Sequence, residues 1–282
     1  MKPVTTTSIR NSPTDLLENC QQSMRSQLDV ESRRALQAWW HGAREGSAAL
    51  VETILAQPET DWMRAILAHR AHRHAWYDEL ADTVSVEEYA AFLLENWAFP
   101  AFLPLVERTL TVQICDRGRV AVRRNIDDEQ VPAPHAELMR RMMRAVKSKA
   151  GDVPLEMYSS LVDRTLVFYY GYYCDPWHLV GSLCATEVLG LHRMIKMDAG
   201  LRRLGFDPAD LEYIRVHLAC DDSHAREWSD DVILPSVQRD HELHRPIAEG
   251  IAACLETSAR YLDDLCARNQ RQLSGHSAIS LA

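Results

Sequence analysis

The segment HLACDDSHAREW, residues 217–228, places two histidines, two aspartates and a glutamate in one turn-free stretch. On an α-helix, which advances about 100° per residue, His217, Asp221 and His224 fall within about 60° of one another. Trp228 returns to the same side of the helix. The segment therefore predicts an amphipathic helix whose polar face is either a solvated seam or a strip of metal ligands.

Composition indicates the same fold class for the rest of the chain. Hydrophobic residues make up 46% of the 282 positions, enough to form a core, whereas only 11 are glycine. No stretch alternates apolar and polar residues in the way an exposed strand does. We therefore expect an all-α protein, a single bundle of about seven core helices preceded by N-terminal helices. The domain is expected to span residues 12–270, with a disordered N-terminus over 1–11 and a flexible tail over 271–282.

Helix boundaries follow from capping signals. Ser12 before Pro13 is typical of a helix start, Ser85 and Glu88 form a capping box, and Gly205 is typical of a helix end. The aromatic run FYYGYYCDPW, residues 168–177, is expected to interrupt the helices around it. Together with hydrophobic periodicity, these signals predict helices over residues 13–27, 31–43, 47–57, 60–82, 85–100, 118–130, 154–170, 176–204, 208–232 and 245–269, with another beginning near 135.

Charge and cysteine content exclude several classes of protein. The net charge of −9 and scattered basic residues argue against a nucleic-acid-binding protein, which normally carries a basic stripe. Seven cysteines, an odd number without a CxxC pair, argue against a disulfide framework or a zinc ribbon. The sequence begins without an apolar signal-like region and contains no run of eighteen apolar residues. We expect a soluble cytoplasmic protein with free thiols and no membrane partner.

Glu187 is the strongest partner for the residues of the opening segment. It stands among Leu183, Val188 and Leu191, where an unpaired carboxylate is costly. If helices 176–204 and 208–232 form an antiparallel hairpin, Glu187 lies roughly 25 Å from the turn, and the Asp221–His224 strip lies roughly 21–25 Å from it. The hairpin register therefore predicts that these carboxylates and imidazoles meet at one level.

A third contribution must come from another helix, and NIDDEQVPAPH, residues 125–135, offers Glu129 and His135. Six residues turn a helix about 240° from its first position, so one regular helix does not align this pair. Pro132 and Pro134 interrupt a regular helix here. Asp128 is an alternative to Glu129 as the early carboxylate. Two other histidine groups, within 69–74 and 241–244, are weaker metal candidates. The first has no carboxylate in register before Asp78, and the second lies near a break before Pro246.

The aromatic and polar residues near these segments are candidates for a substrate pocket, although most aromatic side chains in a bundle serve in packing. Glu95 stands in an otherwise apolar run and is compatible with either a cationic amine or solvent. The pocket candidates are Glu95, Trp97, Phe99, Tyr170, Tyr173 and Trp228.

With these residues identified, the sequence resembles the haem-oxygenase-like non-haem diiron oxidases and oxygenases over roughly residues 60–235. The late motif H-x3-D-x2-H matches His217, Asp221 and His224, and the middle glutamate of the family matches Glu187. The early carboxylate and histidine of the family match Glu129 and His135. The resemblance implies that these six residues hold two irons, which alternate between Fe(II) and Fe(III), with Glu129, Glu187 and Asp221 as the carboxylates of the catalytic centre and O2 as co-substrate.

Members of that superfamily hydroxylate nitrogen in amines or guanidines, or cleave carbon–carbon bonds of fatty or amino acids. We expect an oxidoreductase that N-oxygenates a small amine or amino-acid-derived metabolite in a biosynthetic pathway. Oxidative decarboxylation or C–C cleavage is the alternative on the same site, and a metal-free helical binding protein is the non-enzymatic alternative. The expected partners are a small-molecule substrate and an external electron donor, and a homodimer is left open.

Overall fold

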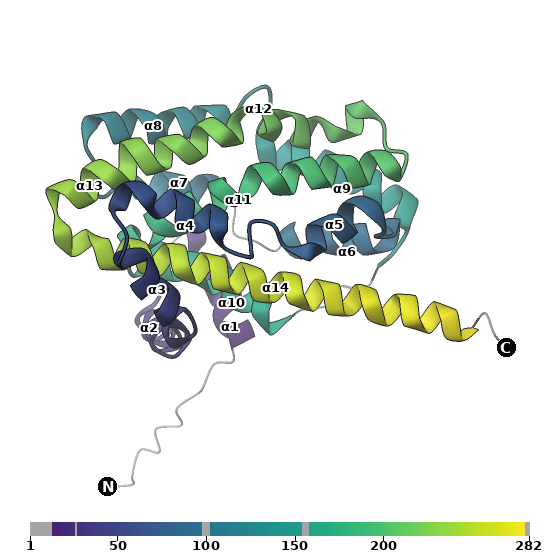
Figure 1. Ribbon diagram of the computed structural model, residues 1–282, viewed down its shortest axis with the longest axis horizontal. Helices are drawn as coiled ribbons and strands as arrows, with labels where there is room; N and C mark the ends of the chain where they lie inside the picture. Colours follow the sequence, from purple (N-terminus) through teal and green to yellow (C-terminus); the bar gives the residue numbers. More distant parts are fainter. Residues whose placement is uncertain (1–12, 26, 98–101, 154–157, 280–282) are drawn as a thin grey trace, which may run out of the picture.

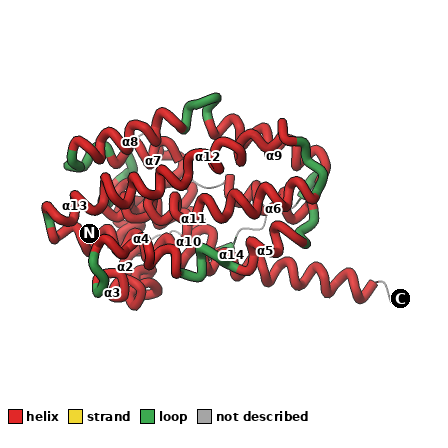
Figure 2. Tube along the Cα trace, turned by 45° about the horizontal axis from the view of Figure 1, so that its top comes forward, coloured by secondary structure: helices red, strands yellow, loops and turns green. Residues whose placement is uncertain are grey.

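The computed structural model describes residues 13–25, 27–97, 102–153 and 158–279, and the expected disordered segment 1–11 lies outside them. In the described ranges every regular element is helical, which confirms the all-α prediction (Figures 1 and 2). The α-helices are α1 (Pro13–Gln22), α2 (Val30–Ala43), α3 (Ala48–Leu55), α4 (Trp62–Ala68), α5 (Ala75–Asp82), α6 (Val86–Trp97), α7 (Phe102–Thr109), α8 (Asp116–Asp128), α9 (His135–Ala150), α10 (Ser159–Tyr173), α11 (Pro176–Arg203), α12 (Glu212–Glu227), α13 (Leu234–Arg239) and α14 (His244–Ile279).

Helix α11 runs through the middle of the bundle and is buried along most of its length. Asp175 caps its start by accepting hydrogen bonds from the backbone N–H groups of Trp177 and His178, with Pro176 at the first helical position. It ends before Gly205, whose φ of +74° is the left-handed conformation that terminates helices. Helices α10, α12 and α14 pack along α11, so the bundle surrounds this central element (Figure 1).

Two hydrophobic clusters divide α11 between them. One gathers around its N-terminal half and includes Leu183, Trp228 and Ile251, and the other gathers around its C-terminal half and includes Tyr89 and Met197. Polar residues of the candidate site lie where the two clusters meet. No helix within the described ranges is long and apolar enough to span a lipid bilayer.

Several predicted helix boundaries are wrong, beginning with the first helix, which ends at Gln22 rather than at residue 27. Residues 60–82 form two helices, α4 and α5, rather than one. The chain breaks because His69 Nδ1 accepts from the Ala71 N–H and His74 Nδ1 accepts from the Trp76 N–H, each at 3.2 Å. Both contacts take backbone donors that a continuous helix needs.

The aromatic run 168–177 does not interrupt its helix until Cys174, because α10 continues to Tyr173. Gly171 lies against Leu179 on α11, where a Cβ at residue 171 would come within 2.8 Å, so the two helices approach closely there. The last helix was expected to end near residue 269 and to be followed by a tail. Helix α14 instead continues to Ile279 (Figure 1).

The predicted capping box at the start of α6 is confirmed. The Glu88 N–H donates to Ser85 Oγ at 3.2 Å, and the Ser85 N–H donates to Glu88 Oε2 at 3.4 Å. These reciprocal bonds satisfy two backbone donors that the first turn of a helix leaves open.

Candidate metal centre

The hairpin of α11 and α12 brings three of the predicted ligand residues together. Glu187 lies midway along α11, while Asp221 and His224 lie on one face of α12. All three side chains are buried, and His224 Nδ1 is 3.8 Å from Glu187 Oε2. The register expected from the hairpin is therefore found in the structure.

The link between α8 and α9 adds Glu129 and His135. Glu129 caps the end of α8 and His135 is the first residue of α9, so the proline-containing turn brings them together instead of a helical face. The His135 N–H donates to the Glu129 carbonyl at 2.9 Å, which closes the turn. His135 Nδ1 then lies 3.3 Å from Glu129 Oε2, and its ring lies 4.7 Å, between centroids, from that of His217.

Two of the three imidazoles have one nitrogen directed at a backbone carbonyl. His217 Nδ1 is 2.7 Å from the Tyr213 carbonyl oxygen, and His135 Nε2 is 3.2 Å from that of Val131. Because a carbonyl only accepts, the nitrogen that faces it carries the proton and donates. In the neutral imidazoles, His217 Nε2 and His135 Nδ1 then carry the lone pairs that a metal ligand requires.

The contacts of the third imidazole, His224, indicate which of Asp128 and Glu129 is the early ligand. His224 Nε2 is 2.9 Å from Asp128 Oδ2, while its Nδ1 is directed toward Glu187. A carboxylate behind a histidine orients the ring and makes the opposite nitrogen a better ligand. Glu129 instead groups with His135 and His217. The geometry therefore favours Glu129 as the early ligand and gives Asp128 the outer position.

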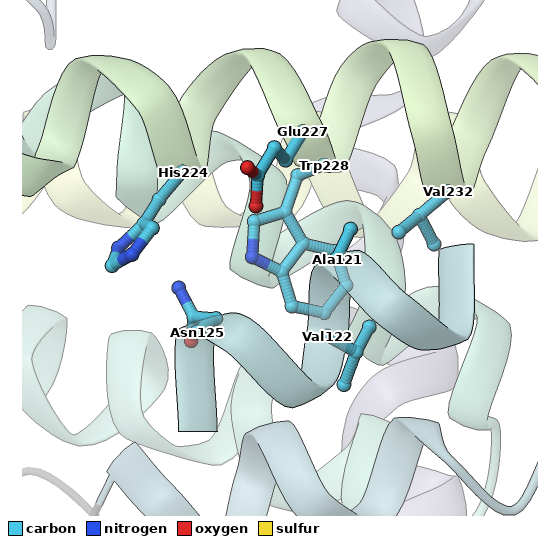
Figure 3. A pocket seen from close by; sticks show the side chains of 7 residues that line it. All are labelled: Ala121, Val122, Asn125, His224, Glu227, Trp228 and Val232. Atoms are coloured by element: carbon cyan, nitrogen blue, oxygen red, sulfur yellow. The ribbon is translucent and has the colours of Figure 1, made fainter. Parts of the chain in front are cut away.

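Asn125 on α8 completes the surroundings of Glu187. Its Nδ2 donates to Glu187 Oε1 at 3.1 Å, and both side chains are buried. Figure 3 shows Asn125 and His224 on facing sides of a narrow crevice that Trp228 also lines. The amide fixes one oxygen of the central glutamate and leaves the other directed at His224.

Burial perturbs the pKa values of these groups strongly. Burial and the nearby charge of Asp221 raise the pKa of Glu187 well above its usual range. Burial also raises the pKa of Asp221 to about 7, against the opposing effect of Arg193. These carboxylates are crowded in a low-dielectric interior, so a bound cation would favour their ionised forms.

The pKa values of two histidines in this cluster are shifted in opposite directions. Burial lowers the pKa of His217 to about 4, so that this imidazole is neutral near pH 7. Burial acts in the same sense on His135, but the contact with Glu129 outweighs it and the pKa of His135 is raised. A neutral imidazole is the form that binds a metal.

The residues present fit a pair of iron ions. Donor atoms of Glu129, His135 and His217 lie within 4.8 Å of one another, as do donor atoms of Asp221, His224 and Cys220. The Cys220 thiol is unsuited to the role because burial raises its pKa to about 12 and it donates to the Val216 carbonyl at 3.2 Å. Three carboxylates, including Glu187, and three imidazoles form the oxygen and nitrogen donor set that iron prefers.

A cavity of about 470 Å³ opens directly onto this cluster. Helices α6, α7, α9, α10, α11 and α12 all contribute to its wall. Glu129, His135, Glu187, His217 and Asp221 form the side of the candidate metal centre. Its other lining residues are Phe92, Leu93, Asn96, Phe102, Leu103, Gln130, Pro134, Ala136, Met139, Arg164, Thr186, Gly190, Arg193, Met194, Met197 and Tyr213.

The structure places three of the predicted pocket residues away from this cavity. Glu95 is fully buried, accepts from the Tyr261 hydroxyl at 2.7 Å and pairs with Arg268. Tyr170 stacks on Trp40, with ring centroids 4.9 Å apart. The Tyr173 hydroxyl donates to the Cys20 carbonyl at 2.9 Å. These side chains were misassigned because polar and aromatic residues in apolar runs also serve in packing.

The remaining pocket candidates have other positions. Trp228 is buried beside His224 in the crevice of Figure 3, not in the large cavity. Trp97 is the last residue of α6, and its side chain, like all of Phe99, lies outside the described residues.

Histidines of the two weaker groups contact carboxylates away from the cavity. His69 lies 3.5 Å from Glu256, and His74 lies 3.0 Å from Asp263. His244, in the second group, lies 2.6 Å from Glu59. The structure thus supplies carboxylate partners that the sequence alone did not reveal, but at the rim of the bundle.

Several residues of the site were missed from the sequence. Asn125, Arg164, Gly190 and Arg193 lie on the cavity or bind its ligand residues. Gly190 and Arg193 follow Glu187 on the same helix within a face of about 120°, so a helical wheel centred on Glu187 would have identified them. Asn125 gave a weaker signal, a single polar residue on the buried face of α8.

A family model described as iron-containing redox enzyme matches residues 91–259, more than half of the chain. The matched range includes α8, α9, α11 and α12, and so all six residues of the cluster. No curated protein matches the chain significantly.

Proposed function

Because the chain belongs to the family of iron-containing redox enzymes, we propose that it is an O2-dependent non-haem diiron oxygenase acting on a small amine or amino-acid-derived metabolite. Family membership makes it an oxidoreductase of haem-oxygenase-like, all-α fold. The diiron count and the reaction are the proposal.

One observation carries the proposal: two groups of potential ligand atoms occur beside the same buried glutamate, Glu187, which lines one cavity with Glu129, His135, His217 and Asp221 and faces His224. Glu129, His135 and His217 would hold one iron, and Asp221 and His224 would hold the other with Glu187. Three carboxylates give the ligands a charge of −3 against the +4 of two ferrous ions, and this near-neutrality suits a buried site.

Iron at such a site supplies the electrons that activate O2. The chain supplies geometry and protection from water. Asp128, Tyr213 and Val131 hold the three imidazoles in their ligating orientations. Asn125 holds one oxygen of Glu187. The apolar wall of the cavity excludes water from the reacting part of the substrate.

Anaerobic loading with Fe(II) tests the proposal. We expect about two irons per chain in the wild type and a loss of iron in His217→Ala and Glu187→Ala. His192→Ala is a matched control, because His192 lies on α11 but packs against His72 and Tyr77. Folded wild-type protein that takes up no iron would instead indicate a metal-free helical binding protein.

The mass of the product then distinguishes the two reactions. A gain of oxygen on exposure of the loaded protein and substrate to O2 supports N-oxygenation. Loss of CO2 or of a carbon fragment supports oxidative decarboxylation or C–C cleavage. The test requires an electron donor, for which ascorbate or a reduced ferredoxin can be supplied.

A further inference from the structure

The cavity beside the candidate metal centre is lined by charged groups of both signs. Glu129, Glu187 and Asp221 contribute negative charge, and Arg164 and Arg193, which are close enough to repel each other, form an arginine wall. Much of the remaining lining is apolar, built by Phe92, Leu93, Phe102, Leu103, Met139, Met194 and Met197. Arg193 partly offsets the negative charge of Asp221 and Glu187 in the metal-free protein, but neither arginine is among the six candidate iron ligands.

Arg193 lies on the face of α11 that lines the cavity. Thr186, Glu187, Gly190, Met194 and Arg193 itself fall within about 120° on a helical wheel. Among the residues that the structure describes, Arg193 makes no hydrogen bond or ion pair, although it is only partly exposed. A guanidinium in a cavity with its donors unused is a costly arrangement unless a ligand completes it.

Arg164 on α10 is the second cation of this wall and is buried, with 8% of its surface exposed. Its Nη1 donates to Asn96 Oδ1 at 3.1 Å, and its guanidinium lies 5.5 Å from the centre of the Tyr261 ring. The Tyr261 hydroxyl in turn donates to Glu95. These contacts help to fix the Arg164 guanidinium at the cavity wall.

The charges of the cavity favour an anion once iron is bound. The three carboxylates and the two arginines together carry −1, and two ferrous ions would bring this to +3. This step rests on the proposed function. A carboxylate on the substrate would offset part of the excess, and its two oxygens match the paired donors of a guanidinium.

We propose that Arg193, supported by Arg164, forms a subsite for the carboxylate of the substrate. The ligand is then a small carboxylic acid with an apolar body, lodged between the arginine wall and the candidate iron site. A simple amine without a carboxylate fits this wall poorly, because two guanidinium groups repel an ammonium ion.

Three probes with the same five-carbon tail test the subsite: hexanoate, hexanamide and hexylammonium. Their affinities are measured by calorimetry under anaerobic conditions on protein loaded with Fe(II). We expect hexanoate to bind at least about ten-fold more tightly than hexanamide, and hexylammonium to bind most weakly.

Variants of Arg193 separate this subsite from direct binding of hexanoate to iron. Arg193→Gln should weaken hexanoate binding about 10- to 100-fold and leave hexanamide binding unchanged, while Arg193→Lys should retain part of the affinity. Arg202→Gln is the matched control, since Arg202 is an exposed residue of α11 paired with Asp198. Iron content is measured in every sample.

The possible results are distinct. Equal affinities for hexanoate and hexanamide, undetectable hexanoate binding, or unchanged hexanoate affinity in Arg193→Gln each overturn the subsite while two bound irons leave the proposed function intact. Failure of the wild type to bind iron overturns the proposed function, and with it the charge excess that calls for an anion.

Discussion

Gly190 on α11 lies directly against Asp221 on α12. A Cβ at residue 190 would be 2.6 Å from Asp221 Oδ2 and 3.2 Å from its Cγ. Real carbon atoms do not approach a carboxylate oxygen so closely, so Asp221 occupies the space that a side chain at residue 190 would fill. The position of a central carboxylate thus depends on the absence of a side chain on the neighbouring helix.

Substitution of Gly190 by alanine should displace Asp221 and lower Fe(II) affinity by about ten-fold or more, in the range expected when the support of a metal ligand is lost. Anaerobic Fe(II) titration measures the effect. Gly42→Ala is the control, because Gly42 is also helical but has no atom within 4 Å of the added Cβ. Both variants gain helix propensity, so equal iron affinity in both would contradict a steric role for Gly190.

Asp128 is expected to act through His224 rather than by binding iron. Asp128→Asn keeps the shape of the side chain but removes the charge that faces His224 Nε2 at 2.9 Å. We predict a decrease of about 10- to 100-fold in affinity for one of two irons, with the other unchanged. The neighbouring Asp127→Asn, at an exposed position, should bind both irons normally. Loss of both irons in Asp128→Asn would refute this assignment.

The parts of the site that lie on one helix could be predicted from the sequence. His217, Asp221 and His224 need only the helical repeat, and Glu187 needs in addition the length of one hairpin. Asp128 and Glu129 are adjacent and differ by about 100° in direction, so the end of α8 decides which one faces the centre. That end depends on the turn closed by the His135 N–H and the Glu129 carbonyl, and Pro132 and Pro134 indicated a break there without fixing its geometry.

The same distinction explains the fold. Hydrophobic periodicity and standard end signals such as Gly205 predicted the long helices, because these signals are local. The break between α4 and α5 was missed because His69 and His74 replace the usual capping residues. A helical wheel could have placed Arg193 near the Glu187 face, but the cavity that it lines is built by six helices and has no signal in the sequence.

Metal-free protein should lose stability as pH rises through the titration of Asp221. The pKa of this buried carboxyl is raised to about 7 from a usual value near 4, so between these pH values the folded state holds a proton that the unfolded state has released. The loss in the free energy of unfolding begins near pH 4, is complete above about pH 7, and amounts to at most about 4 kcal/mol.

His217 has the opposite effect on the pH dependence of stability. Its pKa is lowered to about 4, so the folded state becomes less stable as pH falls below about 6.5. The test is therefore the difference between wild type and Asp221→Asn in urea unfolding without metal. Asp221→Asn should gain stability relative to wild type as pH rises from 5 to 8. A stability difference that does not vary with pH would show that the pKa of Asp221 is not raised. In wild type, iron should remove this dependence by keeping the carboxylate ionised.

Glu95 is expected to stabilise the fold without contacting substrate. It is fully buried and pairs with Arg268, which is itself 6% exposed. Glu95→Ala leaves that guanidinium buried without its carboxylate, and should lower the free energy of unfolding by about 3–5 kcal/mol. Glu87→Ala, an exposed change on the same helix, should remain within about 0.5 kcal/mol of wild type in the same urea titration. A residue that anchored a cationic amine would behave differently, because its removal would leave stability unchanged and weaken hexylammonium binding. That result would show that Glu95 binds the substrate and that its ion pair with Arg268 contributes little to stability.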